Sequence, residues 1–295
     1  MKKTPSKYIV LIGTFFTSLS SIIIRYSDAP ALVISAYRML FTSLMLLIPV
    51  IINSRSEFKK ISKKEYGLCA VSGIFLALHF ASWITSIKMT TIANSTILVS
   101  CSPIFVALAN YFITKEKLSR KMYIGISLSL AGTIIIALGS SGDAAGSTML
   151  GNILAFLGAI FVAFYLVIGG IVRKNISAGV YVFIVYTSSS LVLFFMCMVS
   201  KTPIYPYAPK EFLLFAALAF FCSILGHTLY NYMIKYVSST LISVSTLSEP
   251  IFASILALFI FNEMPSIYTL SGGIIIIYGI FYYLTAQNKE IKSTD

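Results

Sequence analysis

Charged residues are scarce in this sequence. Asp, Glu, Lys and Arg together make up only 11% of the 295 residues, whereas hydrophobic types make up 58% and the mean hydropathy is +0.90. A soluble domain usually carries about 25% charged residues. The shortage excludes a soluble globular domain, and the long apolar runs between the charges need a lipid bilayer as their solvent.

Acidic residues are especially rare, with 10 Asp and Glu against 22 Lys and Arg, so the net charge is +12. This excess does not indicate a nucleic-acid partner, because such a surface needs a solvated basic domain and no segment is polar enough to form one. Basic residues in short loops between apolar runs are instead typical of the cytoplasmic side of a membrane protein.

The four cysteines indicate neither a disulfide framework nor a zinc finger, because all of them fall inside apolar runs and none has the required spacing. No HExxH, GxSxG or phosphate-binding glycine loop occurs, and no aspartate lies within an apolar run. We therefore expect no enzyme activity, no metal and no cofactor. A membrane enzyme with a metal held by His79, His227 and Glu249 is the alternative that metal retention would test.

Ten apolar runs have roughly the length of a spanning helix, about 20 residues. They are residues 8–24, 31–52, 67–87, 91–113, 121–139, 151–172, 179–200, 211–234, 239–261 and 267–286. None shows the alternation of a membrane β-strand, and backbone hydrogen bonding inside lipid then requires helices. The first run follows three lysines but no cleavage site follows it, so we expect a retained span rather than a signal peptide. The predicted fold is an all-α integral membrane protein.

The basic residues predict the orientation of these spans. With the N-terminus inside, 17 Lys and Arg fall in cytoplasmic segments, and only Arg25, Lys88, Lys201 and Lys210 fall outside. The positive-inside rule then places both termini in the cytoplasm, which requires an even number of spans. We expect a multi-pass protein of the cytoplasmic membrane, with the lipid bilayer as its surroundings.

The sequence matches itself without gaps at an offset of 147 residues. The informative pairs are Lys88/Lys235, Pro103/Pro250, Glu116/Glu263, Gly125/Gly272 and Gly132/Gly279. We therefore predict two five-helix repeats, residues 1–141 and 147–295, joined by the flexible stretch GSSGDAAG at 139–146. An odd number of spans per repeat inserts the second copy upside down. Inverted repeats are typical of alternating-access carriers, with the site at the repeat interface near the midplane.

Two segments carry a family resemblance: SPIFVALANYFITKEKLS at 102–119 and EPIFASILALFIFNEMPS at 249–266, together with SIKMTTIANSTIL at 86–98. Each half has a mid-span proline followed about 13 residues later by a glutamate. This pattern resembles the EamA-like family of the drug/metabolite transporter superfamily. The resemblance implies a ten-helix inverted-repeat fold and a carrier of small metabolites, often an exporter, and it does not name the substrate.

Glu249 is the one acidic residue that falls deep within a predicted span. Ionisable groups in a bilayer are costly and are functional candidates by default. Its repeat equivalent is Ser102, so the acid is not part of the duplicated pattern. We expect Glu249 to exchange a proton or to balance the charge of a substrate amine. The alternative is a structural carboxyl group bonded to Ser245 or Thr246.

Arg38 is a basic residue about two turns inside the second predicted span. It would pair with Glu249 or bind a substrate carboxylate, or else extend to the membrane surface as an anchor. An acid and a base in one cavity would suit a zwitterion such as an amino acid.

Two further groups of polar and aromatic residues lie on the third and eighth predicted spans. His79 and Trp83 are one helical turn apart, as are His227 and Asn231, with Tyr230 beside them. The two histidines are almost equivalent in the repeats, so we predict that both spans line a substrate cavity. The alternatives are helix–helix hydrogen bonds for the histidines and an interfacial anchor for Trp83.

Taken together, the sequence predicts a secondary transporter for a small organic metabolite, best matched by an amino acid or related amine. Export by alternating access, coupled to protons at Glu249, is the expected mode. Glu116 and Glu263 at span ends are expected to be structural. A passive facilitator or channel is the main alternative, although it would need a continuous polar stripe. The oligomeric state stays open, a homodimer included.

Overall fold

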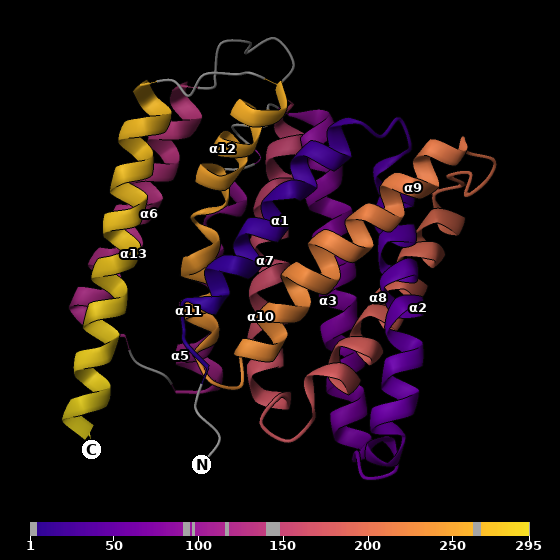
Figure 1. Ribbon diagram of the computed structural model, residues 1–295, viewed down its shortest axis with the longest axis horizontal. Helices are drawn as coiled ribbons and strands as arrows, with labels where there is room; N and C mark the ends of the chain where they lie inside the picture. Colours follow the sequence, from indigo (N-terminus) through magenta and orange to yellow (C-terminus); the bar gives the residue numbers. More distant parts are fainter. Residues whose placement is uncertain are drawn as a thin grey trace.

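The computed structural model describes residues 5–90, 95, 98–115, 118–139, 148–261 and 267–294. Every regular element in this part of the chain is helical (Figure 1). The helices are α1 (Ile9–Arg25), α2 (Ala31–Phe58), α3 (Lys63–Met89), α5 (Ser102–Ile113), α6 (Arg120–Gly139), α7 (Met149–Val172), α8 (Ala178–Val199), α9 (Pro209–Ala217), η2 (Leu218–His227), α10 (Thr228–Met233), α11 (Ser239–Thr246), α12 (Glu249–Phe261) and α13 (Ile267–Thr294).

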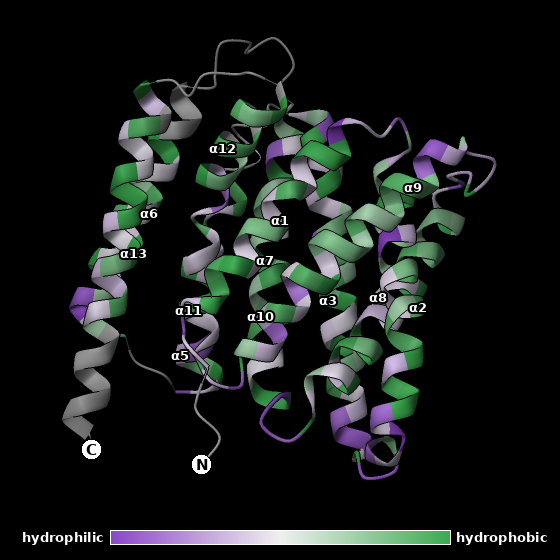
Figure 2. Cartoon of the chain, in the orientation of Figure 1, coloured by the Kyte–Doolittle hydropathy of each residue, from purple (hydrophilic) through white to green (hydrophobic). Residues whose placement is uncertain are grey.

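Six helices of the described residues are long and apolar enough to cross a membrane by length and composition. They are α2, α3, α7, α8 and the composite helices Pro209–Met233 and Ser239–Ile260. Three shorter apolar helices, Ile9–Arg25, Ser102–Ile113 and Leu270–Ala286, accompany them. Figure 2 shows hydrophobic residues along the middles of the helices and hydrophilic residues mainly near their ends. The structure therefore has the hydrophobic helices of a membrane protein, while the total of ten spans stays a prediction.

Side-chain hydrogen bonds cap the N-termini of several helices. Ser62 caps α3: its Oγ accepts from the Glu65 backbone N–H at 3.2 Å, and Glu65 Oε2 accepts from the Ser62 backbone N–H at 2.9 Å. These hydrogen bonds to the carboxylate hold the pKa of Glu65 below its usual value. Thr148, Ser177 and Ser238 cap α7, α8 and α11 in the same side-chain manner.

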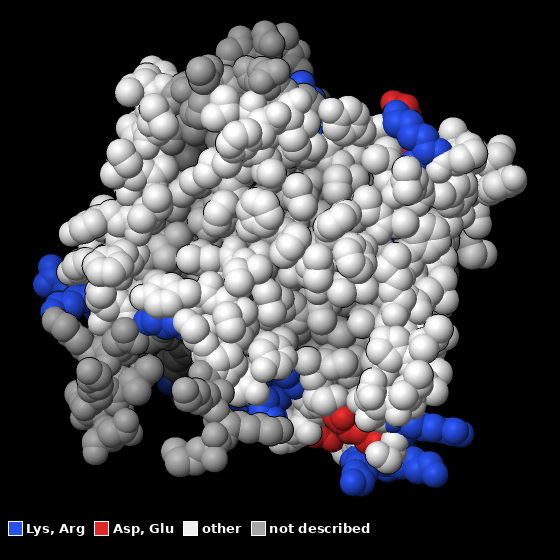
Figure 3. Space-filling view, in the orientation of Figure 1, with Lys and Arg blue, Asp and Glu red and all other residues white. Residues whose placement is uncertain are grey.

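Polar contacts tie the helices together at two opposite ends of the bundle. At one end Lys7 Nζ donates to the Leu284 carbonyl at 3.3 Å, so the start of α1 lies beside the last turns of α13. At the other end, Lys210 lies 3.8 Å from Asp28 in an ion pair. On the face shown in Figure 3, charged groups lie at both ends and at the left edge, while most of the remaining described surface is uncharged.

Two of the predicted spans are interrupted. The span 239–261 consists of α11 and α12 with Leu247 and Ser248 between them, and α5 begins only at Ser102 within the span 91–113. Short i→i−3 bonds mark both places: Ser248 N–H donates to the Ser245 carbonyl and Cys101 N–H to the Leu98 carbonyl. Pro250 and Pro103 follow directly, and proline cannot donate to the preceding turn. The breaks thus occur at equivalent positions of the sequence repeat. Glu116, Glu263 and residues 140–147 lie outside the described residues.

The predicted span 211–234 contains a π-helical segment, η2, between α9 and α10. Within it, Ser223 Oγ donates to the Leu218 carbonyl at 3.4 Å, and Thr228 Oγ1 donates to the Ser223 carbonyl at 3.0 Å, both five residues back. Such segments are rare and occur frequently at functional sites.

The α6–α13 pair packs through four glycines. A Cβ on Gly125 would lie 2.8 Å from the Gly279 carbonyl oxygen, and one on Gly132 would lie 2.6 Å from that of Gly272. Only glycine allows this backbone approach. The contacts are reciprocal, because Gly272 and Gly279 are the repeat equivalents of Gly125 and Gly132.

Candidate functional site

A cavity of about 70 Å³ lies in the middle of the bundle, between α1, α2, α3, α7, the η2–α10 junction and the two helix breaks. Its lining residues are Thr17, Ser20, Arg38, His79, Phe80, Trp83, Val99, Ser100, Ser102, Val162, Tyr165, Leu166, His227, Tyr230, Thr246 and Glu249. The repeat equivalents Ser102 and Glu249 both line it. The cavity therefore brings together residues from almost the whole length of the chain.

Six of the seven predicted site residues line this cavity: Arg38, His79, Trp83, His227, Tyr230 and Glu249. Asn231 does not. It lies behind the wall, where its Nδ2 donates to the Tyr165 hydroxyl and, at 2.7 Å, to the His227 carbonyl. Through the first of these hydrogen bonds Asn231 contacts Tyr165, which does line the cavity.

Arg38 is completely buried, so the alternative of an anchor at the membrane surface is wrong. Its Nε donates to Ser223 Oγ at 2.9 Å, and its guanidinium carbon lies 4.3 Å from the centre of the Phe80 ring. The two terminal amino groups, Nη1 and Nη2, have no partner among the described residues. No described carboxylate lies within ion-pair distance of Arg38, so the expected pair with Glu249 is not formed. A planar pair of unused charged donors is the group that binds a carboxylate best.

Glu249 begins α12 and accepts a hydrogen bond from Thr17 Oγ1 at 2.7 Å. The alternative partners Ser245 and Thr246 donate instead to carbonyls of their own helix, those of Leu241 and Ser243. The carboxyl group is thus connected to α1 and is not used to stabilise its own helix. A helix N-terminus also favours a negative charge at this position.

Thr17 connects Glu249 to Tyr230. Its Oγ1 lies 3.0 Å from the Tyr230 hydroxyl, and that hydroxyl donates to Thr14 Oγ1 at 3.1 Å. Close backbone packing fixes this arrangement: a Cβ on Gly226 would lie 2.6 Å from Thr17 Cγ2, and one on Gly13 would lie 2.8 Å from the Tyr230 ring.

The two histidines differ in their surroundings. His79 Nδ1 is 2.9 Å from the Gly158 carbonyl, which can only accept, so this nitrogen carries the proton. This is the helix–helix hydrogen bond of the structural alternative. The same ring stacks on Trp83, with 6.0 Å between the ring centres. His227 Nδ1 is buried and has no hydrogen-bond partner within the described part of the chain, and its ring makes T-shaped contacts with Phe80 and Tyr230.

Trp83 lines a second cavity as well as the central one. The second cavity, about 260 Å³, is also lined by Ser21, Ile24, Arg25, Ser27, Ile87 and Lys88. These residues lie at the C-terminal ends of α1 and α3, at the end of the bundle where Asp28 pairs with Lys210. Trp83 therefore stands between the central cavity and one end of the bundle.

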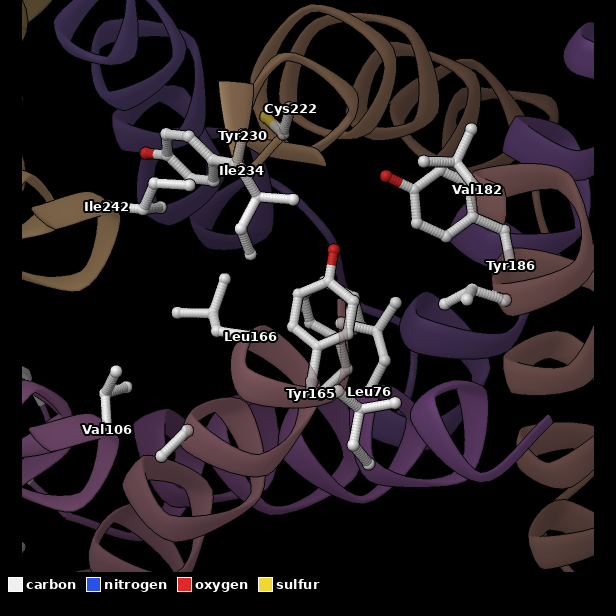
Figure 4. Packing of buried hydrophobic residues seen from close by; sticks show 14 of the residues in the cluster. Leu76, Val106, Tyr165, Leu166, Val182, Tyr186, Cys222, Tyr230, Ile234 and Ile242 are labelled. Carbon is white, nitrogen blue, oxygen red and sulfur yellow. The ribbon is translucent and has the colours of Figure 1, made fainter. Parts of the chain in front are cut away.

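Sequence reasoning missed several lining residues, among them Thr17, Ser20, Phe80 and Tyr165. The Tyr165 hydroxyl points from α7 into the interior of the bundle, and the Tyr186 hydroxyl faces the same space (Figure 4). A tyrosine in the middle of an otherwise apolar span was a signal that would have found it. Within the described residues, no three His, Cys, Asp or Glu side chains gather as they would around a metal ion.

Comparison with known proteins assigns the family. The sequence model of the EamA-like transporter family matches residues 6–138 and matches again at residues 149–285, together most of the chain. The chain belongs to the EamA-like transporter family. It is therefore a multi-pass membrane transporter, and the family model recurs in both halves of the sequence.

The relatives of this EamA-like transporter carry transporter names without a substrate. An uncharacterized transporter of Archaeoglobus fulgidus is 26% identical over 224 residues, which cover 75% of each chain. The uncharacterized transporter YyaM of Bacillus subtilis is 22% identical over 92% of each chain. A solved crystal structure with a TM-score of 0.77 and 15% identity covers 96% of this chain and 97% of its own, which shows a shared fold.

Proposed function

We propose that this EamA-like transporter is a secondary carrier that exports an amino acid or related amine across the cytoplasmic membrane, with proton exchange at Glu249. One observation carries the proposal. A buried arginine with two unused amino groups and a carboxyl group face the same central cavity without pairing with each other. Such a pair is costly to maintain in a membrane protein unless a ligand uses it.

The proposed transport cycle is alternating access between two inverted units, residues 1–141 and 147–295. Three observations support it: the family model matches each half, the helix breaks occur at equivalent positions, and the glycine contacts of α6 and α13 are reciprocal. Broken helices near the midplane are typical of carriers with such repeats. The cavity of about 70 Å³ is smaller than the ~300 Å³ of a typical ligand pocket, so binding must involve widening of the site.

The proposed orientation places both termini in the cytoplasm. Lys7 and the last turns of α13 lie at one end of the bundle, which agrees with an even number of crossings. The connections between α2 and α3 and between α7 and α8, which hold Lys59, Lys60 and Lys174, lie at the same end (Figure 1).

The substrate class follows from the two ionisable groups. A substrate carboxylate would bind the amino groups of Arg38 in a two-point manner that a lone amine cannot use. Its ammonium group would approach ionised Glu249, and the aromatic wall of Phe80, Trp83 and Tyr165 would contact its side chain. Protonation of Glu249 would remove the attraction for the ammonium group, so proton binding and substrate binding would compete.

Transport by the purified full chain in proteoliposomes tests this function. The probes are the individual radiolabelled amino acids and small amines, each with and without a pH gradient. We expect saturable flux of one or a few of them, driven by the gradient, and loss of the pH dependence in Glu249→Gln. Glu65→Gln is the matched control, because it makes the same change outside the cavity. Full pH-dependent flux in Glu249→Gln would refute the coupling role, and flux that does not saturate would favour a channel.

A further inference from the structure

A chain of hydrogen bonds connects Thr14 and Thr17 of α1, through the Tyr230 hydroxyl, with the Glu249 carboxyl group of α12. Thr17 Oγ1 is within hydrogen-bond distance of Glu249 Oε1 (2.7 Å), the Tyr230 hydroxyl (3.0 Å) and the Thr14 carbonyl (3.0 Å). A threonine hydroxyl has one proton, so it can donate to only one acceptor at a time. The Glu249 carboxylate and the Thr14 carbonyl therefore compete for the same proton.

We propose that the Thr17 hydroxyl is a two-position switch. It donates its proton either to Glu249 or to the Thr14 carbonyl of α1, depending on whether Glu249 is ionised, and its contact with Tyr230 changes accordingly. The switch rests on the proposed proton exchange at Glu249. When Glu249 is ionised, Thr17 donates to it and accepts from Tyr230. When Glu249 is protonated, the acid donates to Thr17, whose own proton turns to the Thr14 carbonyl, while Tyr230 donates to Thr14 Oγ1 at 3.1 Å.

The geometry permits both positions without movement of the heavy atoms. Thr17 is 5% exposed, and its methyl group is pressed against Gly226 of η2, which leaves the hydroxyl directed at Glu249 and Tyr230. Only the O–H bond must rotate. The other groups around Glu249 are Arg38 on α2, His79 on α3, Tyr165 on α7, and Cys222, His227 and Tyr230 on η2–α10.

The switch has a mechanical consequence. A hydrogen bond to an ionised carboxylate is about twice as strong as a neutral one. Ionised Glu249 therefore holds α12 firmly to α1, and protonation loosens the contact between two helices that come from opposite halves of the chain. Thr17 is thus a positioning residue that links proton binding to relative movement of the halves.

Infrared titration of the full-length protein in lipid vesicles tests the switch without any substrate. The protonated-carboxyl band of Glu249 is identified as the band missing in Glu249→Gln, and its midpoint is followed against pH. Thr17→Val keeps the shape of the side chain and removes the hydroxyl. It is expected to move the midpoint to higher pH by about one unit, since the ionised form loses a charge-assisted hydrogen bond.

Two variants separate this role from general packing. Thr17→Ser restores a hydroxyl and should titrate as the wild type does. Thr14→Val removes a hydroxyl one turn away that contacts Tyr230 but not Glu249. Because this hydroxyl accepts from Tyr230 only when Glu249 is protonated, its loss should not move the midpoint to higher pH. A wild-type midpoint in Thr17→Val, an equal shift in Thr14→Val, or a Glu249 band that does not titrate would each overturn the proposal. Because the readout needs no substrate, a failed transport screen beside an intact shift would reject the proposed function alone.

Discussion

Replacement of Arg38 by methionine tests whether this arginine binds the substrate or only stabilises the fold. Methionine is flexible and of similar length, so it fills the space of the side chain without its charge. The change removes the hydrogen bond to Ser223 and the contact with the Phe80 ring. It also removes two buried amino groups that have no hydrogen-bond partner in the portion of the chain that the structure describes.

These effects nearly cancel in the free energy of unfolding. A hydrogen bond from a charged donor contributes about 1.5–3 kcal/mol, and a desolvated cation–π contact about 2 kcal/mol. Each buried donor without a partner costs about 1–3 kcal/mol, and the desolvated charge itself adds to this cost. We therefore expect Arg38→Met to change stability by less than about 2 kcal/mol, whereas loss of one partner of a buried ion pair costs about 3–5 kcal/mol.

Substrate binding should respond much more strongly. Two charge-assisted hydrogen bonds to a carboxylate contribute about 3–6 kcal/mol, so the Kd of the amino acid found by the transport screen should rise about 10²–10⁴-fold. Arg38→Lys retains the charge but not the planar fork, and should restore only part of the affinity. Thermal unfolding in detergent and equilibrium binding measure the two effects. An unchanged Kd would show that Arg38 does not bind the substrate, and a loss of stability of more than about 3 kcal/mol would show that the arginine has a structural role.

The remaining predictions concern the cavity wall and the peripheral helices. His79→Ala and Trp83→Ala should each weaken substrate binding in the same equilibrium assay, because both rings line the cavity; unchanged affinity in both would remove α3 from the site. Gly132→Ala should destabilise the protein by about 1–3 kcal/mol, since its Cβ would meet the Gly272 carbonyl at 2.6 Å. Gly67→Ala is the control, because nothing lies within 4 Å of its Cβ, and equal melting temperatures of the two variants would contradict the packing argument.

The sequence was sufficient to recognise the class of protein and the most costly residues of the site. Apolar runs that water cannot solvate require a membrane, and a proline, a glutamate and two glycines in one register indicate duplication. Arg38 and Glu249 were visible for the same physical reason: a charge inside a bilayer is expensive, so a single one stands out from its span.

Only the tertiary structure decided which side chains meet. Hydroxyl groups are common in membrane helices and can bond to their own backbone at little cost, so nothing in the sequence distinguished Thr17 from its neighbours. The π-helical segment η2 has hydrogen bonds to carbonyls five residues back instead of four. The apolar sequence LAFFCSILGH does not predict this change. That segment contributes Ser223 to Arg38 and His227 to the cavity. Helical periodicity predicts which face a residue occupies, but the partner across the interface is set by how the helices pack.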